Sequence, residues 1–344
     1  MQARRNALLN VKVTERVHTH AGLWLDKYLT DQTEEGVKDE RATAAKATLI
    51  QQVSQFGIPT GYQESFIRRK TLFTELETKG NALCREATSQ GRMIIGLGQK
   101  GPVEAGLALE HTWGVPMIPG SALKGLTMAA AHLLLEDEAW RKKADGRGSS
   151  LALLGGTTEQ IGSVVFHDAW WIPEGEGLPI HPDVMTVHHA DYYTNGEVSP
   201  SDMDNPNPVP FASVTGKYLV VVEKTSPKVE DELLDAALYI LKLGLDHLGI
   251  GAKTNAGYGR MTLELKAGLE VERLQQAVDR VCASAEGRRD AFMSEPFESL
   301  LQAVHIHERA TALLVMKPLF EDKKLKRKCQ SEIEQLRRIL EGKE

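Results

Sequence analysis

The stretch HLGIGAKTNAGYGR, residues 247–260, is the most informative part of this sequence. Glycine lets backbone N–H groups take up positive φ and approach a ligand closely. Successive exposed N–H groups form a nest for anions, and two long cationic side chains flank this one. The composition predicts a backbone cradle for phosphate. Its candidate residues are Gly249, Gly251, Lys253, Thr254, Asn255, Gly257, Tyr258, Gly259 and Arg260.

Two other interpretations of this stretch are a P-loop for a nucleoside triphosphate and a glycine-rich turn that binds no ligand. A P-loop has the pattern G-x-x-x-x-G-K-[ST] between a strand and a helix. Here Ala252 separates Gly251 from Lys253, and the expected order is reversed, with a helix over 231–247 before the stretch and a strand over 260–265 after it. These differences argue against a nucleoside triphosphate site. A glycine-rich turn without any ligand stays open as the second alternative.

The composition of the whole chain narrows the class of protein. Its 344 residues suffice for one large domain or two smaller ones. The formal net charge of -6 argues against an indiscriminate nucleic-acid coat but permits a local basic groove. The three cysteines lack C-x-x-C spacing, which favours a reducing cytosol. We find no signal peptide or membrane span and expect a cytoplasmic protein without a cofactor.

The order of periodic segments predicts three parts. Residues 1–90 form a helical N-terminal extension with helices over 38–56 and 66–90, and residues 269–344 form a helical C-terminal extension. Between them, the order β-α-β-β-α-β predicts an α+β, ferredoxin-like (RRM-like) domain over 91–268 with an insertion at 173–210. Its expected elements are the strand 92–98, helix 121–139, strand 163–171, strand 217–224, helix 231–247 and strand 260–265. The basic run near Lys326 is interpreted as a solvated face, with a nucleic-acid patch as the alternative.

A second motif, IPGSALKG at residues 118–125, opens the first helix of this domain. Ser121 is a good N-cap residue after Pro119 and Gly120. Lys124 follows one turn later, beside the free N–H groups and the positive end of the helix dipole. We therefore expect a second anion site at Ser121 and Lys124. Both sites should lie on one edge of the sheet, so that a chain of phosphates runs between them.

The two motifs, in this order, resemble the RAMP superfamily of CRISPR-associated RNA-binding proteins. The segments VFHDAW (165–170), DVMTVHH (183–189) and 202–210 look like those of a subunit of the type III-B (Cmr) effector complexes. The resemblance covers residues 91–266. It implies one RAMP domain in a helical ribonucleoprotein, near the 3′ end of the crRNA. The implied partners are crRNA, target RNA, the repeated backbone RAMP subunits and the small helical subunit, with no membrane.

The resemblance also gives the insertion a role. In related backbone subunits it forms a thumb that wedges between base pairs of the guide–target duplex. By that resemblance His188, Tyr192 and Tyr193 are candidates for wedging or stacking. The alternative is that the two tyrosines form the core of the thumb. The sheet lacks the aromatic consensus of an RRM, so we do not expect bases to stack on its face.

Catalysis by this chain is not expected. RNA-cleaving RAMP subunits carry an aspartate between the first strand and the IPGS motif, whereas residues 91–120 hold only Glu104 and Glu110 as acids. We therefore interpret the chain as a non-catalytic RNA-binding subunit. The alternatives are an RNA-cleaving backbone subunit, a metal-independent endoribonuclease with a His or Tyr as acid or base, and a module that contacts only protein.

Two further chemistries are disfavoured. The S-x-x-K pattern of Ser121 and Lys124 lacks the S-D-N and K-T-G partners of acyl-enzymes. The histidine groups lack a full set of ligands at zinc-site spacing, so no metal site is expected. These groups are His188 with His189 and Asp191, His305 with His307 and Glu308, and the pair His18 and His20.

Overall fold

A computed structural model describes residues 19–30, 40–99, 101–103, 105–143, 146–187, 189, 192–193, 199–204, 207–265, 269–284, 288–304 and 309–341. The chain forms two compact units, Met1–Glu264 and Leu265–Glu344. Within the described ranges, no helix combines the length and apolar character needed to cross a membrane.

The first unit is organised around an antiparallel sheet with the strand order β10-β1-β9-β6-β2, in which β5 also pairs with β9. The central strand β9 buries Val220, Val221 and Val222 in succession, because both of its faces are covered. In register, Cys84 of β1 lies opposite Val221 of β9. The strands are β1 (Ala82–Ser89), β2 (Met117–Ile118), β5 (Val164–Phe166), β6 (Ala169–Trp171), β9 (Lys217–Lys224) and β10 (Met261–Leu263).

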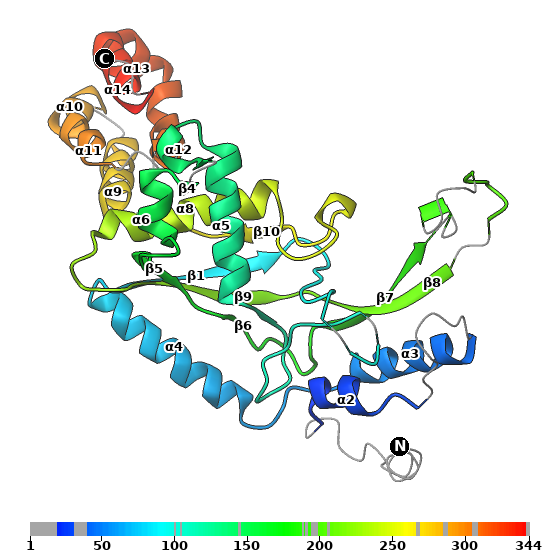
Figure 1. Ribbon diagram of the computed structural model, residues 1–344. Coiled ribbons are helices and arrows are strands. Elements are labelled where there is room, and N and C mark those ends of the chain that lie inside the picture. The colour runs from blue at the N-terminus through cyan, green and yellow to red at the C-terminus, as the bar shows by residue number, and fades with distance from the viewer. Residues whose placement is uncertain are drawn as a thin grey trace. The chain divides into compact units, whose positions relative to one another are not determined.

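Helices cover both faces of this sheet (Figure 1). Helices α5 (Gly120–Leu134) and α8 (Asp231–His247) pack together on one face, and a Cβ at Gly244 would lie only 2.8 Å from Leu126 Cγ. Helix α4 (Tyr62–Thr78) lies on the other face, where the Arg69 guanidinium sits 4.4 Å from the centroid of the Trp170 ring. Neither face is open for bases to stack on.

A two-stranded hairpin, β7 (Ile180–Val187) and β8 (Asn207–Val214), lies largely within the insertion. Helix α3 (Glu40–Val53) packs on it, and α2 (Ala21–Lys27) packs on α3. The paired register runs from Ile180 opposite Val214 to Val187 opposite Asn207, so β8 continues past residue 210. Smaller elements near α5 are η2 (Glu138–Trp140), β3 (Lys142–Lys143), β4 (Gly146–Arg147) and α6 (Ser149–Gly155).

The first strand differs from the prediction. Residues 66–90 were expected to be helical and 92–98 to form a strand, but α4 ends at Thr78 and β1 spans Ala82–Ser89. Met93 makes only an isolated bridge to Val214. The polar residues of β1 do not show the pattern of a buried strand. Arg85 is buried there because its guanidinium pairs with α4, where Nη1 lies 2.6 Å from Glu77 Oε1. An ion pair between two different elements cannot be recognised from the residues of either one alone.

The start of α5 also differs from the prediction. The helix begins at Gly120 after Pro119, so Ser121 is its second residue and not its N-cap. The expected single strand over 163–171 is instead two strands, β5 and β6, separated by His167 and Asp168. The strand 217–224 and the helix 231–247 are confirmed with their predicted bounds.

The second unit is helical and has a hydrophobic core of its own. Buried side chains from Val271 to Leu340 form one cluster, which includes Phe292, Phe320 and Leu325. Its helices are α9 (Leu269–Ala283), α10 (Arg288–Ser294), α11 (Phe297–Ala303), α12 (Arg309–Glu321), α13 (Lys323–Lys328) and α14 (Gln330–Glu341). The sequence predicts helices over 271–284, 296–304 and 331–340 in this part of the chain, and these correspond to α9, α11 and α14.

Candidate nucleic-acid interface

The glycine-rich stretch connects α8 to β10 and folds against the segment that follows β1. The Ala252 N–H donates to the Ile94 carbonyl (2.8 Å), and the Gly259 N–H donates to the Arg92 carbonyl (3.0 Å). The Ile250 N–H closes the loop by donating to the Gly259 carbonyl (2.9 Å). A short 3-10 turn, η3 (Thr254–Ala256), forms its tip. We call residues 249–260 the glycine loop.

Two of the glycines are explained by packing alone. A Cβ at Gly251 would lie 2.2 Å from the Ile94 carbonyl oxygen, and one at Gly259 would lie 2.0 Å from the Ile250 carbonyl oxygen. Both residues also have positive φ. No side chain fits at either position. The ligand-free interpretation of the stretch therefore accounts for part of its composition.

The tip of the glycine loop has the features of an anion nest. Within the described residues, the N–H groups of Gly251, Lys253, Thr254 and Asn255 have no hydrogen-bond partner. Lys253 and Asn255 are exposed. Lys253 has φ 58, one of two non-glycine residues with positive φ in the described ranges. Backbone strain of this kind concentrates at functional sites. The tip presents free donors and one cation to solvent.

Two predicted contact residues have structural partners instead. The Arg260 Nη1 donates to the Asp246 carbonyl (3.0 Å) and so satisfies the C-terminal end of α8. The Tyr258 hydroxyl donates to Asp183 Oδ2 of β7 (2.9 Å). The Tyr258 hydroxyl would have to give up this bond to donate to a phosphate, whereas the Arg260 guanidinium has further N–H donors.

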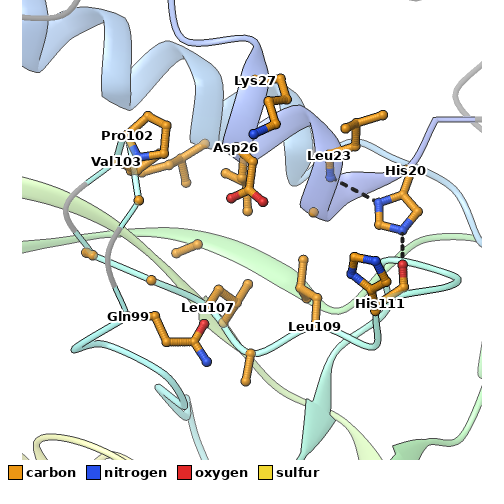
Figure 2. Close-up of a pocket in the computed structure, with 18 of the residues that line it drawn as sticks. His20, Leu23, Asp26, Lys27, Gln99, Pro102, Val103, Leu107, Leu109 and His111 are labelled. Carbon is orange, nitrogen blue, oxygen red and sulfur yellow. Dashed lines mark hydrogen bonds between the residues drawn. The ribbon is translucent and has the colours of Figure 1, made fainter.

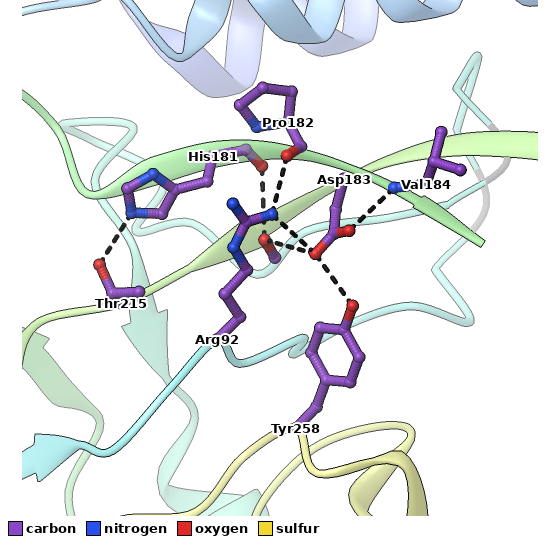
Figure 3. A network of polar contacts seen from close by, with 8 residues as sticks. Arg92, His181, Pro182, Asp183, Val184, Thr215 and Tyr258 are labelled. Carbon is purple, nitrogen blue, oxygen red and sulfur yellow. Dashed lines mark hydrogen bonds and ion pairs between the residues drawn. The ribbon is translucent and has the colours of Figure 1, made fainter.

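Asp183 joins the glycine loop to the hairpin (Figure 3). Its Oδ2 also lies 2.9 Å from Arg92 Nη1 and 3.3 Å from the Ser213 hydroxyl of β8. Its Oδ1 accepts from the Val184 N–H (2.9 Å). One carboxylate therefore ties together the glycine loop, both strands of the hairpin and the segment after β1.

The electrostatics of this network follow from its contacts. Burial acts to raise the pKa of Asp183, but hydrogen bonds from Arg92, Val184 and Tyr258 outweigh it and hold that pKa below its ordinary value. Burial, then the bond to Asp183, raises the pKa of Tyr258, which keeps its hydroxyl a donor. Burial and the nearby Arg92 cation lower the pKa of His181, whose Nε2 lies 2.9 Å from the Thr215 hydroxyl.

The second predicted anion site is only partly available. The Gly120 N–H at the start of α5 donates to Asp168 Oδ1 (2.7 Å), and the Ala122 and Leu123 N–H groups donate to the Pro119 carbonyl. A phosphate would meet a carboxylate at this helix start. What remains for a ligand is the exposed Ser121 and the half-buried Lys124, which has no ion-pair partner in the described ranges.

The two motifs adjoin the outermost strands of the sheet path. The IPGS motif follows β2, and the glycine loop precedes β10; these two strands stand at opposite ends of the strand order. Backbone hydrogen bonds connect the motifs through the loops: the Ala252 N–H donates to the Ile94 carbonyl, the Ala108 N–H to the Ile95 carbonyl and the Met117 N–H to the Ala108 carbonyl. The expected run of phosphates between the two motifs stays a prediction.

Tyr192 and Tyr193 lie beyond the paired part of the hairpin and are exposed, at 43% and 77%. Their rings contact each other edge to face at a centroid distance of 5.3 Å. This exposure fits a stacking role better than the alternative of a thumb core. His188 lies outside the described residues. Its neighbour His189 has φ 59 and an Nδ1 that lies 2.8 Å from Asp204 Oδ2.

A cavity of about 610 Å³ lies between α2 and the segment that precedes the IPGS motif (Figure 2). The carboxyl of Glu110 in that segment accepts from the Thr112 and Trp113 N–H groups (2.9 and 2.8 Å), so it is engaged. Glu104 lies outside the described residues. Two charged side chains of α2, Asp26 and Lys27, line the cavity. Sequence reasoning missed both, because no local motif relates α2 to this segment.

His20 of the N-terminal pair has a structural role. The His20 ring accepts from the Leu23 N–H at Nδ1 (3.0 Å) and lies 2.9 Å from the His111 carbonyl at Nε2, which fixes α2 against the cavity wall (Figure 2). Among the described residues, no group of three His, Cys, Asp or Glu side chains is placed to hold a metal. His18, Asp191, His305, His307 and Glu308 lie outside those residues.

Comparison with known proteins finds a matching family model and a similar protein. The RAMP superfamily model matches residues 86–262. The CRISPR system Cmr subunit Cmr6 of Pyrococcus furiosus is 30% identical over 244 aligned positions, which cover 55% of this chain and 70% of that protein.

Two solved structures are similar. One is the cryo-EM structure of the type III-B Cmr-beta bound to cognate target RNA, with a TM-score of 0.51, 20% identity and coverage of 68% of this chain and 78% of the other. This likeness concerns the fold alone. The other is the crystal structure of Pyrococcus furiosus Cmr6, with a TM-score of 0.35, 27% identity and coverage of 53% and 98%.

Proposed function

This chain belongs to the RAMP superfamily, and we propose that it is a non-catalytic, Cmr6-like RNA-binding subunit of a type III-B CRISPR effector complex in the cytoplasm. In this proposal it binds the backbone of the crRNA near its 3′ end and helps to shape the duplex with target RNA. Its partners are the backbone RAMP subunits and the small helical subunit. The 30% identity to the Cmr6 protein supports the assignment.

The tip of the glycine loop is the observation that carries this proposal. Free N–H groups at Gly251, Lys253, Thr254 and Asn255 offer donors to phosphate oxygens without any base preference. The Lys253 side chain adds a charge, and no atom lies within 4 Å of a Cβ built at Gly257. The loop therefore leaves room for a sugar-phosphate backbone. Gly249 and Gly259 shape the loop, while Tyr258 and Arg260 hold it in place.

Ser121 and Lys124 form the second, weaker contact of the proposal. They act through side chains only, because the start of α5 is occupied by Asp168. We further propose that His188, Tyr192 and Tyr193 meet the guide–target duplex as a thumb. The exposed, mutually packed rings of the two tyrosines support a stacking role.

We also propose that the first unit contains a ferredoxin-like domain. Taking β1, β5 with β6, β9 and β10 as the four strands, their order in the sheet and the packing of α5 with α8 fit the split βαβ, ferredoxin-like arrangement. We propose that the hairpin β7–β8 is its thumb. In the proposed division, a helical C-terminal extension starts near residue 269, and the RAMP domain includes β1.

Retention of guide RNA in the assembled complex tests this function. Lys253→Ala and Lys124→Ala should each reduce the crRNA that copurifies with the complex, with the larger loss for Lys253. Lys142→Ala is the matched control, an exposed lysine outside both contacts. Full retention of crRNA in the Lys253→Ala and Lys124→Ala double variant would overturn the proposal.

The second candidate function is RNA cleavage, and one observation favours it. Asp26 lines the cavity beside the segment in which cleaving relatives carry their aspartate, so α2 supplies an acid that the segment lacks. Labelled target RNA incubated with the purified chain and divalent metal separates the two functions. Cleavage lost in Asp26→Asn, or in Glu110→Gln, would establish an enzyme. Intact RNA with the unaltered chain supports the non-catalytic subunit.

A further inference from the structure

The short helix α13, Lys323–Lys328, presents a dense set of positive charges on a fixed support. Five of its six residues are cations, and all five are exposed: Lys323, Lys324, Lys326, Arg327 and Lys328. The sixth, Leu325, is 1% exposed and lies in the core of the C-terminal unit. Cys329, directly after the helix, is buried in the same core. The charges are therefore held on a packed element.

The acids next to this helix are engaged with other groups. Asp322 caps α13, since its Oδ1 accepts from the Lys324 N–H (2.7 Å) and the Leu325 N–H (3.0 Å). Its Oδ2 lies 2.7 Å from Arg288 Nη1. The Glu321 carboxylate lies 3.9 Å from Lys317 Nζ. In the described part of the chain, none of the five cations has an ion-pair partner.

This arrangement calls for an external partner with several negative charges. Cations four residues apart, such as Lys323 and Arg327, repel each other on a helix. Six helical residues span only about 9 Å, so the charges are concentrated. No acid in the described ranges forms an ion pair with them, although the whole chain has a net charge of -6. A polyanion matches such a surface better than one small ion, because the cations are exposed and enclose no pocket.

We propose that α13 binds the phosphate backbone of RNA. This contact is additional to those of the glycine loop and of Ser121 and Lys124, and it lies on the C-terminal unit. The choice of RNA over an acidic protein segment rests on the proposed function, which puts this chain on RNA. Phosphate contacts by lysine and arginine carry no sequence information. The contact adds affinity and salt dependence without changing which guides are accepted.

Salt-dependent binding of the full chain to a fluorescently labelled oligouridine tests the proposal. The test variant is Lys326→Gln, Arg327→Gln and Lys328→Gln together. The matched control removes three exposed lysines elsewhere: Lys142→Gln, Lys143→Gln and Lys228→Gln. Each lost phosphate contact lowers the slope of log K against log salt by about 0.7 for single strands. We expect a slope reduced by roughly 1–2 in the test variant and unchanged in the control.

Three outcomes would overturn the proposal. In the first, the slope of RNA binding against salt falls equally in the test and control variants. In the second, this slope falls in neither variant. In the third, the test variant loses its binding to polyglutamate but keeps its binding to RNA. Lys253→Ala separates these failures from that of the proposed function. If it weakens binding and the test variant does not, only the role of α13 falls. If the unaltered chain binds RNA without salt dependence, both fall. Equal urea midpoints check that every variant is folded.

Discussion

Replacing Asp183 by alanine should destabilise the first unit and loosen the glycine loop from the hairpin. The side chain is only 17% exposed and accepts bonds from Arg92, Tyr258 and Ser213. The Arg92 side chain is 45% exposed, so solvent screening limits that pair to about 0.5–1 kcal/mol. Losing the Tyr258 bond costs about 1.5 kcal/mol, and leaving the buried Ser213 hydroxyl without this acceptor costs about 1 kcal/mol.

These contributions add to a loss of about 3 kcal/mol in the free energy of unfolding. Urea denaturation followed by tryptophan fluorescence measures it. Asp246→Ala is the control, because the carboxylate of this residue pairs with Lys242 alone among the described side chains, and its loss should cost at most about 0.5 kcal/mol. A loss below about 1 kcal/mol for Asp183→Ala would refute the network as a structural joint.

A double-mutant cycle isolates the bond between the loop and the hairpin. Asp183→Asn and Tyr258→Phe, alone and combined, should show a coupling free energy of about 1 kcal/mol. Additive losses would mean that the two groups do not support each other. The same variants should also shift the RNA crosslinks of Tyr192 and Tyr193, because the hairpin would no longer be fixed to the loop.

Three more predictions follow from the contacts described. Lys253→Gly should be more stable than Lys253→Ala by roughly 0.5–1 kcal/mol in urea unfolding, because an L-residue with φ 58 is strained; both should lose RNA affinity equally, and equal stability would contradict the strain. Asp168→Asn should raise RNA affinity in a filter-binding assay, because it removes a carboxylate from the start of α5; an unchanged affinity would argue against the second contact. Because the pKa of His181 is lowered, the unfolded chain binds a proton first, so stability should fall as pH drops below about 6.5; His181→Gln should reduce that fall in pH-dependent unfolding, and an equal fall would exclude this histidine as the cause.

The sequence predicted those elements whose signal is local. The valines of β9 and the amphipathic repeat of α8 gave correct bounds, because burial on the sheet selects their residue types. Strand β1 escaped detection because Arg85 is neutralised by Glu77 from another element. The glycine loop stood out because only glycine permits its backbone paths at Gly251 and Gly259.

The parts of the site that depend on contacts between distant segments were not predictable. Nothing near Asp168 in the sequence indicates that its carboxylate occupies the start of α5. Asp183 was noticed only as part of an insertion, although it bonds Arg92 and Tyr258 across 91 and 75 residues. Asp26 belongs to a helix that sequence reasoning treated as an extension.

Helical cover on both faces of the sheet separates the residues that fold the first unit from those exposed to a partner (Figure 1). Surface connections tolerate exchange far better than packed layers do. Substitutions at the tip of the glycine loop can therefore change the affinity for RNA while the melting temperature of the protein stays the same. A lineage could therefore strengthen or weaken its hold on RNA by changing only a handful of solvent-facing positions.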